Sequence, residues 1–128
     1  MNPILGQTPV TIAGERRTLV CDMNAGAALF DFDQHWTLWL AERFVAKPTR
    51  VDGKTLMHLP PLSPGDLSIA LYAMLATDRA QKSRDESPES LRMAIGIRQI
   101  AELQQACTRA VLAGLGVPGE GIEAVASE

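Results

Sequence analysis

The spacing of apolar residues near the C-terminus constrains the fold of this chain most. Five of them follow one another at steps of four, three, seven and four: Met93, Ile97, Ile100, Cys107 and Val111. Such spacing places side chains on one face of an α-helix, and a Ser-Pro-Glu start signal precedes the segment. We therefore expect one long amphipathic helix over residues 88–113. Its apolar face should be buried, so that Ile97→Asp would cost several kcal/mol.

A β-hairpin is predicted for residues 8–22. Val10 and Ile12 alternate with polar residues before a Gly14-Glu15 turn, and Leu19 and Cys21 alternate after it. Gly14 at the first turn position favours a type II′ turn, which needs a positive φ there. Because an isolated hairpin is only marginally stable in water, we expect it to pack on helices or pair with another chain.

Two further helical segments are expected, at residues 25–46 and 66–79. Asn24 is a suitable N-cap for the first, which has a short helix up to Phe30 and a second stretch after Asp33. Ser63 is a suitable N-cap for the other, with Pro64 at its first helical position. Between them, prolines and glycines predict a mobile loop over residues 47–64, with room for a small ribbon on either side of Asp52-Gly53.

Together these segments predict an α+β fold, mainly α. An N-terminal β-hairpin is followed by a small helical bundle of three to four helices. The chain has 128 residues, of which 46% are hydrophobic and 21% charged, as in ordinary globular proteins. We expect a single domain over residues 1–116 and a flexible tail over residues 117–128.

Charge and cysteine content exclude several classes of function. The net charge is −3 and the 12 basic residues are scattered, which argues against a nucleic-acid-binding protein. No apolar run is long enough for a membrane span, so we expect a cytoplasmic protein without a membrane partner. Cys21 and Cys107 are far apart and lack a CxxC spacing. We expect two buried thiols in a reducing compartment rather than a disulfide or metal site.

Two glycine- or acid-containing motifs resemble ligand sites only superficially. Gly114, Gly116 and Gly119 form a GxGxxG pattern, but it closes a helix instead of following a strand. The segment Asp22 to Asp33 begins like a calcium loop but lacks glycine at position six and glutamate at position twelve. The start of that segment, Asp22 to Asn24, is better interpreted as a helix cap.

No residue is assigned a catalytic, cofactor-binding or metal-binding role. Asp31 and Asp33 would point to different sides of a helix, and no run of ligands accompanies them. His35 and His58 are the only histidines, and nothing in the sequence orients them toward a thiol. We therefore expect a protein that is not an enzyme.

Aromatic residues gather in one part of the chain, where we place the candidate partner-binding residues Trp36, Trp39 and Phe44. With Phe30 and Phe32 they hold most of its aromatic content. At helical spacing such a cluster is typical of a core face. Tryptophan is also enriched at interaction hot spots, so an exposed contact surface is the alternative.

The order of these parts resembles the tail assembly chaperones of long-tailed phages and gene transfer agents. The similarity covers about residues 3–116. It rests on Pro3, Gly6 and Gly14, an Arg-Thr-Leu second strand, and the Asp22-Met23-Asn24-Ala25 start of a helix that contains Leu29. A leucine-rich helix (67–75) and a Ser-Pro-Glu-capped final helix (90–112) follow. Phe30-Asp31, where the family often has an acidic pair, and the apparent insertion at residues 47–61 depart from its pattern.

The resemblance implies a chaperone without enzymatic activity. Such a protein binds the long helical tape-measure protein and keeps it soluble until the tail-tube protein replaces it. Covering the apolar stripe of a tape-measure helix would suppress its aggregation. Self-association into a homo-oligomer is a further expectation. Two alternatives remain open: a structural head-tail connector or tail protein of the virion, and a small helical regulator or adaptor.

Overall fold

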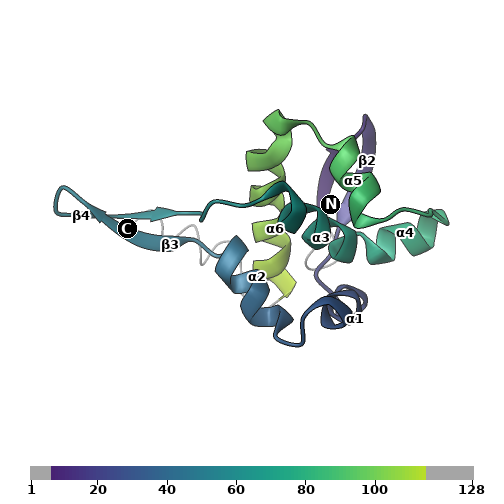
Figure 1. Cartoon of the computed structure of the whole chain (residues 1–128), viewed down its shortest axis with the longest axis horizontal. Coiled ribbons are helices and arrows are strands. Elements are labelled where there is room, and N and C mark those ends of the chain that lie inside the picture. Colours follow the sequence, from purple (N-terminus) through teal and green to yellow (C-terminus); the bar gives the residue numbers. More distant parts are fainter. Residues whose placement is uncertain (1–6, 115–128) are drawn as a thin grey trace.

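The computed structural model describes residues 7–114, which form an N-terminal hairpin, a second hairpin and a set of short helices (Figure 1). The elements in chain order are β1 (Thr8–Ile12), β2 (Glu15–Leu19), α1 (Met23–Phe32), α2 (Trp36–Phe44), β3 (Lys47–Val51), β4 (Lys54–His58), α3 (Pro64–Met74), α4 (Ala76–Lys82), α5 (Pro88–Ala94), the 3-10 helix η1 (Ile97–Gln99) and α6 (Ile100–Gly114). The predicted α+β, mainly α class is confirmed. The helices in residues 7–114 outnumber the predicted three to four because the predicted helices 66–79 and 88–113 are each divided. The predicted flexible tail, 117–128, lies outside the described residues.

The first hairpin forms where it was predicted, but with a different turn. Strands β1 and β2 pair in antiparallel register, with Ile12 opposite Glu15. The turn residues are therefore Ala13 and Gly14, whose φ values of 53° and 79° are both positive. This pattern is typical of a type I′ turn, so the predicted type II′ turn at Gly14-Glu15 is wrong.

The predicted helical segment 25–46 contains two helices, α1 and α2, in line with the expected short helix up to Phe30 and second stretch after Asp33. Asp22, not Asn24, is the N-cap, because its carboxylate accepts a hydrogen bond from the backbone N–H of Ala25 at 3.0 Å. Asn24 lies in the first turn and donates instead to Thr77. The two helices separate at Asp33, whose carboxylate accepts from the backbone N–H of His35.

The predicted helix over residues 66–79 is also divided. Ser63 caps α3 as expected, accepting from the backbone N–H of Asp66. The backbone turns at Leu75, where ψ is 3°, and α4 then continues to Lys82. This bend allows the chain to return toward the first hairpin.

The long predicted helix over residues 88–113 is broken in the middle. Ser87 caps α5 as its Ser-Pro-Glu sequence indicates, but Ile95 is extended (φ −97°, ψ 129°). The side chain of Gln99 accepts from the backbone N–H of Gly96 and donates to the carbonyl of Thr11, which ties η1 to β1. Helix α6 then begins in a new direction. The expected burial of Ile97 is wrong: its side chain is 87% exposed.

The hydrophobic core lies between the first hairpin, α1, α2, α3 and α6. Its largest fully buried apolar side chains are Leu19, Leu29, Leu40, Phe44, Leu67, Leu71, Met74, Leu75, Leu103, Cys107 and Val111. Cys107 is buried as expected, whereas Cys21 is only partly buried.

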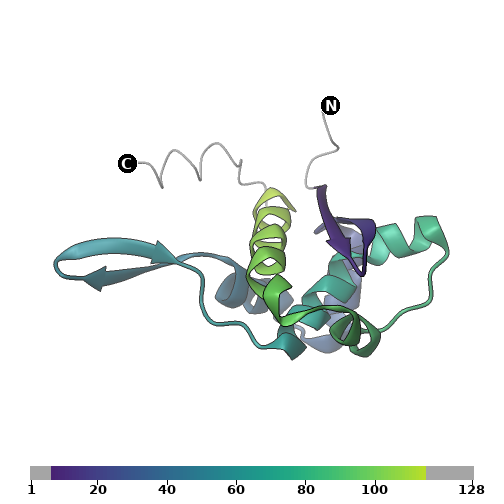
Figure 2. The same cartoon turned by 90° about the horizontal axis from the view of Figure 1, so that it is seen from above.

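The segment predicted as a loop contains a regular ribbon of β3 and β4 that projects away from the helices (Figures 1 and 2). All ten strand residues are exposed. At its base, the side-chain amide of Gln104 donates to the carbonyls of Arg43 and Pro60, on either side of the ribbon. These hydrogen bonds anchor the root of the ribbon to α6.

Candidate partner-binding surfaces

The three candidate partner-binding residues lie at or near the core. Trp39 is 6% exposed and Phe44 is fully buried, while Trp36 is partly buried. The edge of the Phe32 ring packs on Trp39 at a centroid distance of 5.4 Å. The burial of Trp39 and Phe44 agrees with the interpretation of the aromatic stripe as a core face. In the free chain these two side chains offer almost no surface to a partner.

A cation holds this aromatic group in place. The guanidinium carbon of Arg43 lies 4.5 Å from the centroid of the Trp39 ring, and Arg43 Nε is 2.9 Å from a carboxylate oxygen of Asp66. Asp66 belongs to α3, so the contact joins α2 to α3. The stacked guanidinium shields the ring from water. Arg43 therefore links the Trp39 ring of α2 to Asp66 of α3.

Apolar side chains are instead exposed around the break between α5 and α6. Met93 is 81% and Ile97 is 87% exposed. Beside them a hollow of about 150 Å³ is lined mostly by apolar residues of α3, α5, η1 and α6: Pro64, Leu67, Ser68, Arg92, Ile95, Ile97 and Ile100. We call Met93 and the residues of this hollow the Ile97 surface. It offers apolar contact area next to one cation, Arg92.

The helix break creates the Ile97 surface. On a continuous helix, Met93 and Ile97 would share a face with Cys107, which is in the core. The extended backbone of Ile95 rotates α5 relative to α6, so this face is no longer continuous. The one signal in the sequence is Gly96, which is unfavourable in a helix interior.

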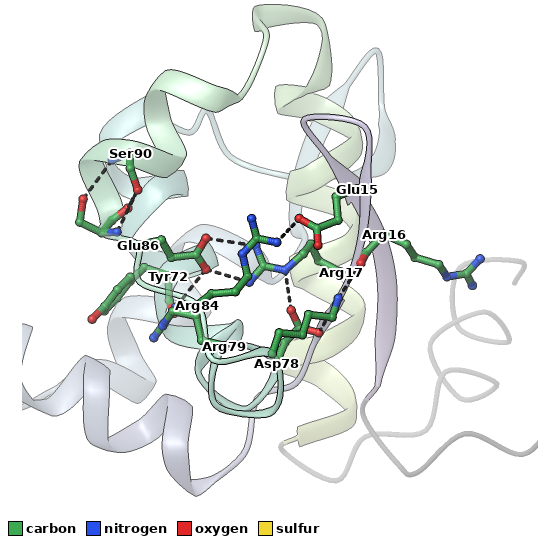
Figure 3. Close-up of polar contacts among 11 residues, drawn as sticks. Glu15, Arg16, Arg17, Tyr72, Asp78, Arg79, Arg84, Glu86 and Ser90 are labelled. Atoms are coloured by element: carbon green, nitrogen blue, oxygen red, sulfur yellow. Dashed lines mark hydrogen bonds and ion pairs between the residues drawn. The ribbon is translucent and has the colours of Figure 1, made fainter.

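A cluster of buried charges joins the first hairpin to α4 and the connector after it (Figure 3). Arg17 is 2% exposed and lies between two carboxylates. Its Nε is 2.5 Å from Asp78, and its other two nitrogens bond to Glu86 at 2.8 and 3.1 Å. Arg79 and Lys82 approach the same carboxylates at 3.6 and 3.3 Å. None of the residues predicted for a site belongs to this cluster.

The charges in the cluster stabilise each other. The pKa of Arg17 is raised, chiefly by its hydrogen bonds to Glu86, and these bonds lower the pKa of Glu86. Burial acts to raise the pKa of Asp78, but hydrogen bonds from Arg17 and Lys82 outweigh it, and the pKa is lowered. All three groups are therefore charged at neutral pH. All three guanidinium nitrogens of Arg17 donate to carboxylates of this chain, so the cluster is built for structure rather than for a ligand.

The cysteines and histidines considered for chemistry lie in different surroundings. Burial raises the pKa of Cys21 to about 11 and raises that of Cys107 further, so both remain thiols at neutral pH. His35 is the N-cap residue before α2, and His58 bonds to Thr49 on the ribbon. Within residues 7–114, no three His, Cys, Asp or Glu side chains gather as metal ligands. In the same part of the chain, no helix has the length and apolar character to cross a membrane.

Comparisons with known proteins place this chain in no family. No family model matches it, and neither a curated protein nor a solved structure is significantly similar to it. The geometry of the exposed surfaces is therefore the basis for a functional proposal.

Proposed function

We propose that this chain is a tail assembly chaperone that binds the tape-measure protein through the Ile97 surface and keeps it soluble. The observation that carries the proposal is the exposure of Met93 and Ile97 beside an apolar hollow. Large exposed apolar side chains grouped around a hollow are typical of a protein-binding site. The resemblance of the sequence to tail assembly chaperones supplies the identity of the partner.

The chemistry of the Ile97 surface suits an apolar helix. Helix-in-groove recognition needs a hollow that accepts one or two apolar anchors, with neighbouring side chains that adapt to them. The hollow supplies the apolar walls, and Met93, which is exposed and follows the lining residue Arg92 in the chain, is an unbranched side chain that adapts to different partners. Such a surface would bind successive turns of a tape-measure helix without a strict sequence requirement. The tail-tube protein would then displace the chaperone.

Co-expression tests this proposal. The chain is produced together with a long helical tape-measure-like protein encoded near it, and the soluble fraction is measured with and without the chaperone. We expect the helical protein to be soluble only when both are present, and to co-purify with the chain. A helical protein whose solubility does not depend on the chain would contradict the proposal.

Matched variants test the surface itself. Ile97→Asp should abolish co-purification, because a charge in the apolar contact would be desolvated without a partner. Gln105→Asp introduces the same charge at an exposed position of α6 outside the Ile97 surface and should bind normally. Since both positions are exposed, both variants should fold. Equal binding by the two variants would exclude the Ile97 surface as the contact.

A further inference from the structure

Among residues 7–114, the ribbon of β3 and β4 has one open edge and one partly blocked edge. Its turn, Asp52-Gly53, contains two residues with positive φ values of 51° and 77°, and Val51 pairs with Lys54. In a hairpin with a two-residue turn, the residue pair next to the turn exchanges both backbone hydrogen bonds. Hydrogen-bonded and non-hydrogen-bonded residue pairs then alternate along the two strands. Thr55 and Met57 on β4 therefore direct their N–H and C=O groups outward. On β3, the corresponding residues are Arg50 and Pro48.

Pro48 makes the two edges unequal. Proline has no N–H, so the outer edge of β3 lacks one of its two donors. The outer edge of β4 keeps both donors and both acceptors. A proline on an edge strand is a known protection against pairing with another chain. Strand addition is therefore favoured at β4 and disfavoured at β3.

We propose that β4 of one copy pairs in antiparallel orientation with β4 of a second copy, forming a four-stranded sheet and a twofold-symmetric dimer. One register pairs every outward backbone group of this edge. It places Thr55 opposite Met57 of the second copy, and Met57 opposite Thr55 of the second copy. All four outward N–H groups and all four outward C=O groups would then be used. Leu56, now 52% exposed, would lie against Leu56 of the second copy.

A second copy fits this edge better than an arbitrary strand, because the edge is complementary to itself in that register. Leu56 meets Leu56 at a non-hydrogen-bonded position, where cross-strand side chains lie closest. Lys54 faces His58 of the second copy rather than another lysine or arginine. The partly blocked edge of β3 stops further addition, so the assembly closes as a dimer instead of growing into a fibre.

The size and charge of the contact set its strength. An edge of five residues is much smaller than the roughly 1,200–2,000 Å² buried in stable complexes, so the dimer should be weak and concentration-dependent. Each ribbon carries Lys47, Arg50 and Lys54 against one acid, Asp52. Because these net positive charges repel each other, added salt should strengthen the dimer. The proposal concerns the chain alone and does not depend on the proposed chaperone function.

Light scattering coupled to gel filtration tests the dimer. We expect the molar mass of the full chain to rise from monomer toward dimer with concentration, and to rise further with salt. Met57→Pro removes an outward donor of β4 but none of the bonds inside the hairpin, so it should keep the chain monomeric. Arg50→Pro makes the matched change on β3 and should leave the dimer intact. A wild-type chain that stays monomeric at about 1 mM would overturn the proposal.

Disulfide trapping tests the register. Across the twofold axis, residues at position 56 would lie close enough for a disulfide, so Leu56→Cys should give a covalent dimer under mild oxidation. Thr49→Cys, on the neighbouring strand of the same hairpin, should not, because β4 of both copies separates the two thiols. If the chain dimerises but Met57→Pro does not weaken the dimer and Leu56→Cys is not trapped, the contact lies elsewhere and the proposal is wrong.

Discussion

Removing the buried guanidinium of Arg17 should strongly destabilise the fold. In Arg17→Met, the carboxylates of Asp78 and Glu86 stay buried but lose their main partner. Breaking a buried ion pair in this way costs about 3–5 kcal/mol. We expect the lower end, about 3 kcal/mol, because Lys82 still approaches Asp78 at 3.3 Å and Arg79 still approaches Glu86 at 3.6 Å.

Thermal denaturation followed by circular dichroism measures this loss. For a chain of this size 1 kcal/mol corresponds to about 4 °C, so the midpoint should fall by about 12 °C. Arg16→Met is the matched control, because Arg16 is the adjacent residue of the same strand and its guanidinium points away from the cluster (Figure 3). That substitution should change stability by less than about 0.5 kcal/mol.

The pH dependence gives an independent test. The pKa values of Asp78 and Glu86 are lowered from ordinary values of 3.8 and 4.5. A group with a lowered pKa stabilises the fold above its ordinary pKa, and this stability is lost as the pH falls through the folded value. The difference between wild type and Arg17→Met should therefore be constant near neutral pH and shrink below about pH 4. Equal midpoints for Arg17→Met and Arg16→Met at pH 7 would refute the reasoning.

Three further outcomes are expected. In chemical denaturation, Ile97→Asp should shift the unfolding free energy by less than about 0.5 kcal/mol. Leu103→Ala, in the core, should lower it by about 2–5 kcal/mol. Equal losses would mean that Ile97 is buried. At pH 8 iodoacetamide should alkylate Cys21 slowly, and the rate should rise as the pH approaches the Cys21 pKa of about 11. Cys107 should react only after unfolding. Rapid labelling of either thiol in mass spectra would contradict their burial. Asp22→Ala should lower stability by about 1 kcal/mol through loss of the α1 cap, and an unchanged melting curve would show that the cap is dispensable.

Local signals located most elements of the fold. The starts of α3 and α5 were predicted from Ser63 and Ser87, because a capping hydroxyl and the proline after it act within a few residues. The first hairpin was predicted from alternation and Gly14, although the turn type was wrong. Asp52-Gly53 marked the turn of the ribbon for the same reason.

The candidate site was not predictable to the same degree. Trp36, Trp39 and Phe44 were identified by their helical spacing, but spacing does not say whether a face meets the core or a partner. In the structure Arg43 stacks on Trp39 and bonds to Asp66 of α3, which is 23 positions further along the chain. Arg17 did carry a weak signal, since it alternates in phase with Leu19 and so shares the buried face of its strand.

The sequence by itself determined where helices and turns begin, because caps, prolines and glycines act on the backbone next to them. Only the tertiary structure decided which faces are covered. Arg17 meets Asp78 across 61 positions, and Gln99 bonds to Thr11 across 88. Such pairings depend on how the elements pack, and they place Ile97 in solvent although its helical periodicity predicted a core position. Burial is a property of the packed chain, so a local pattern indicates it for some residues, such as Arg17, and fails for others, such as Ile97.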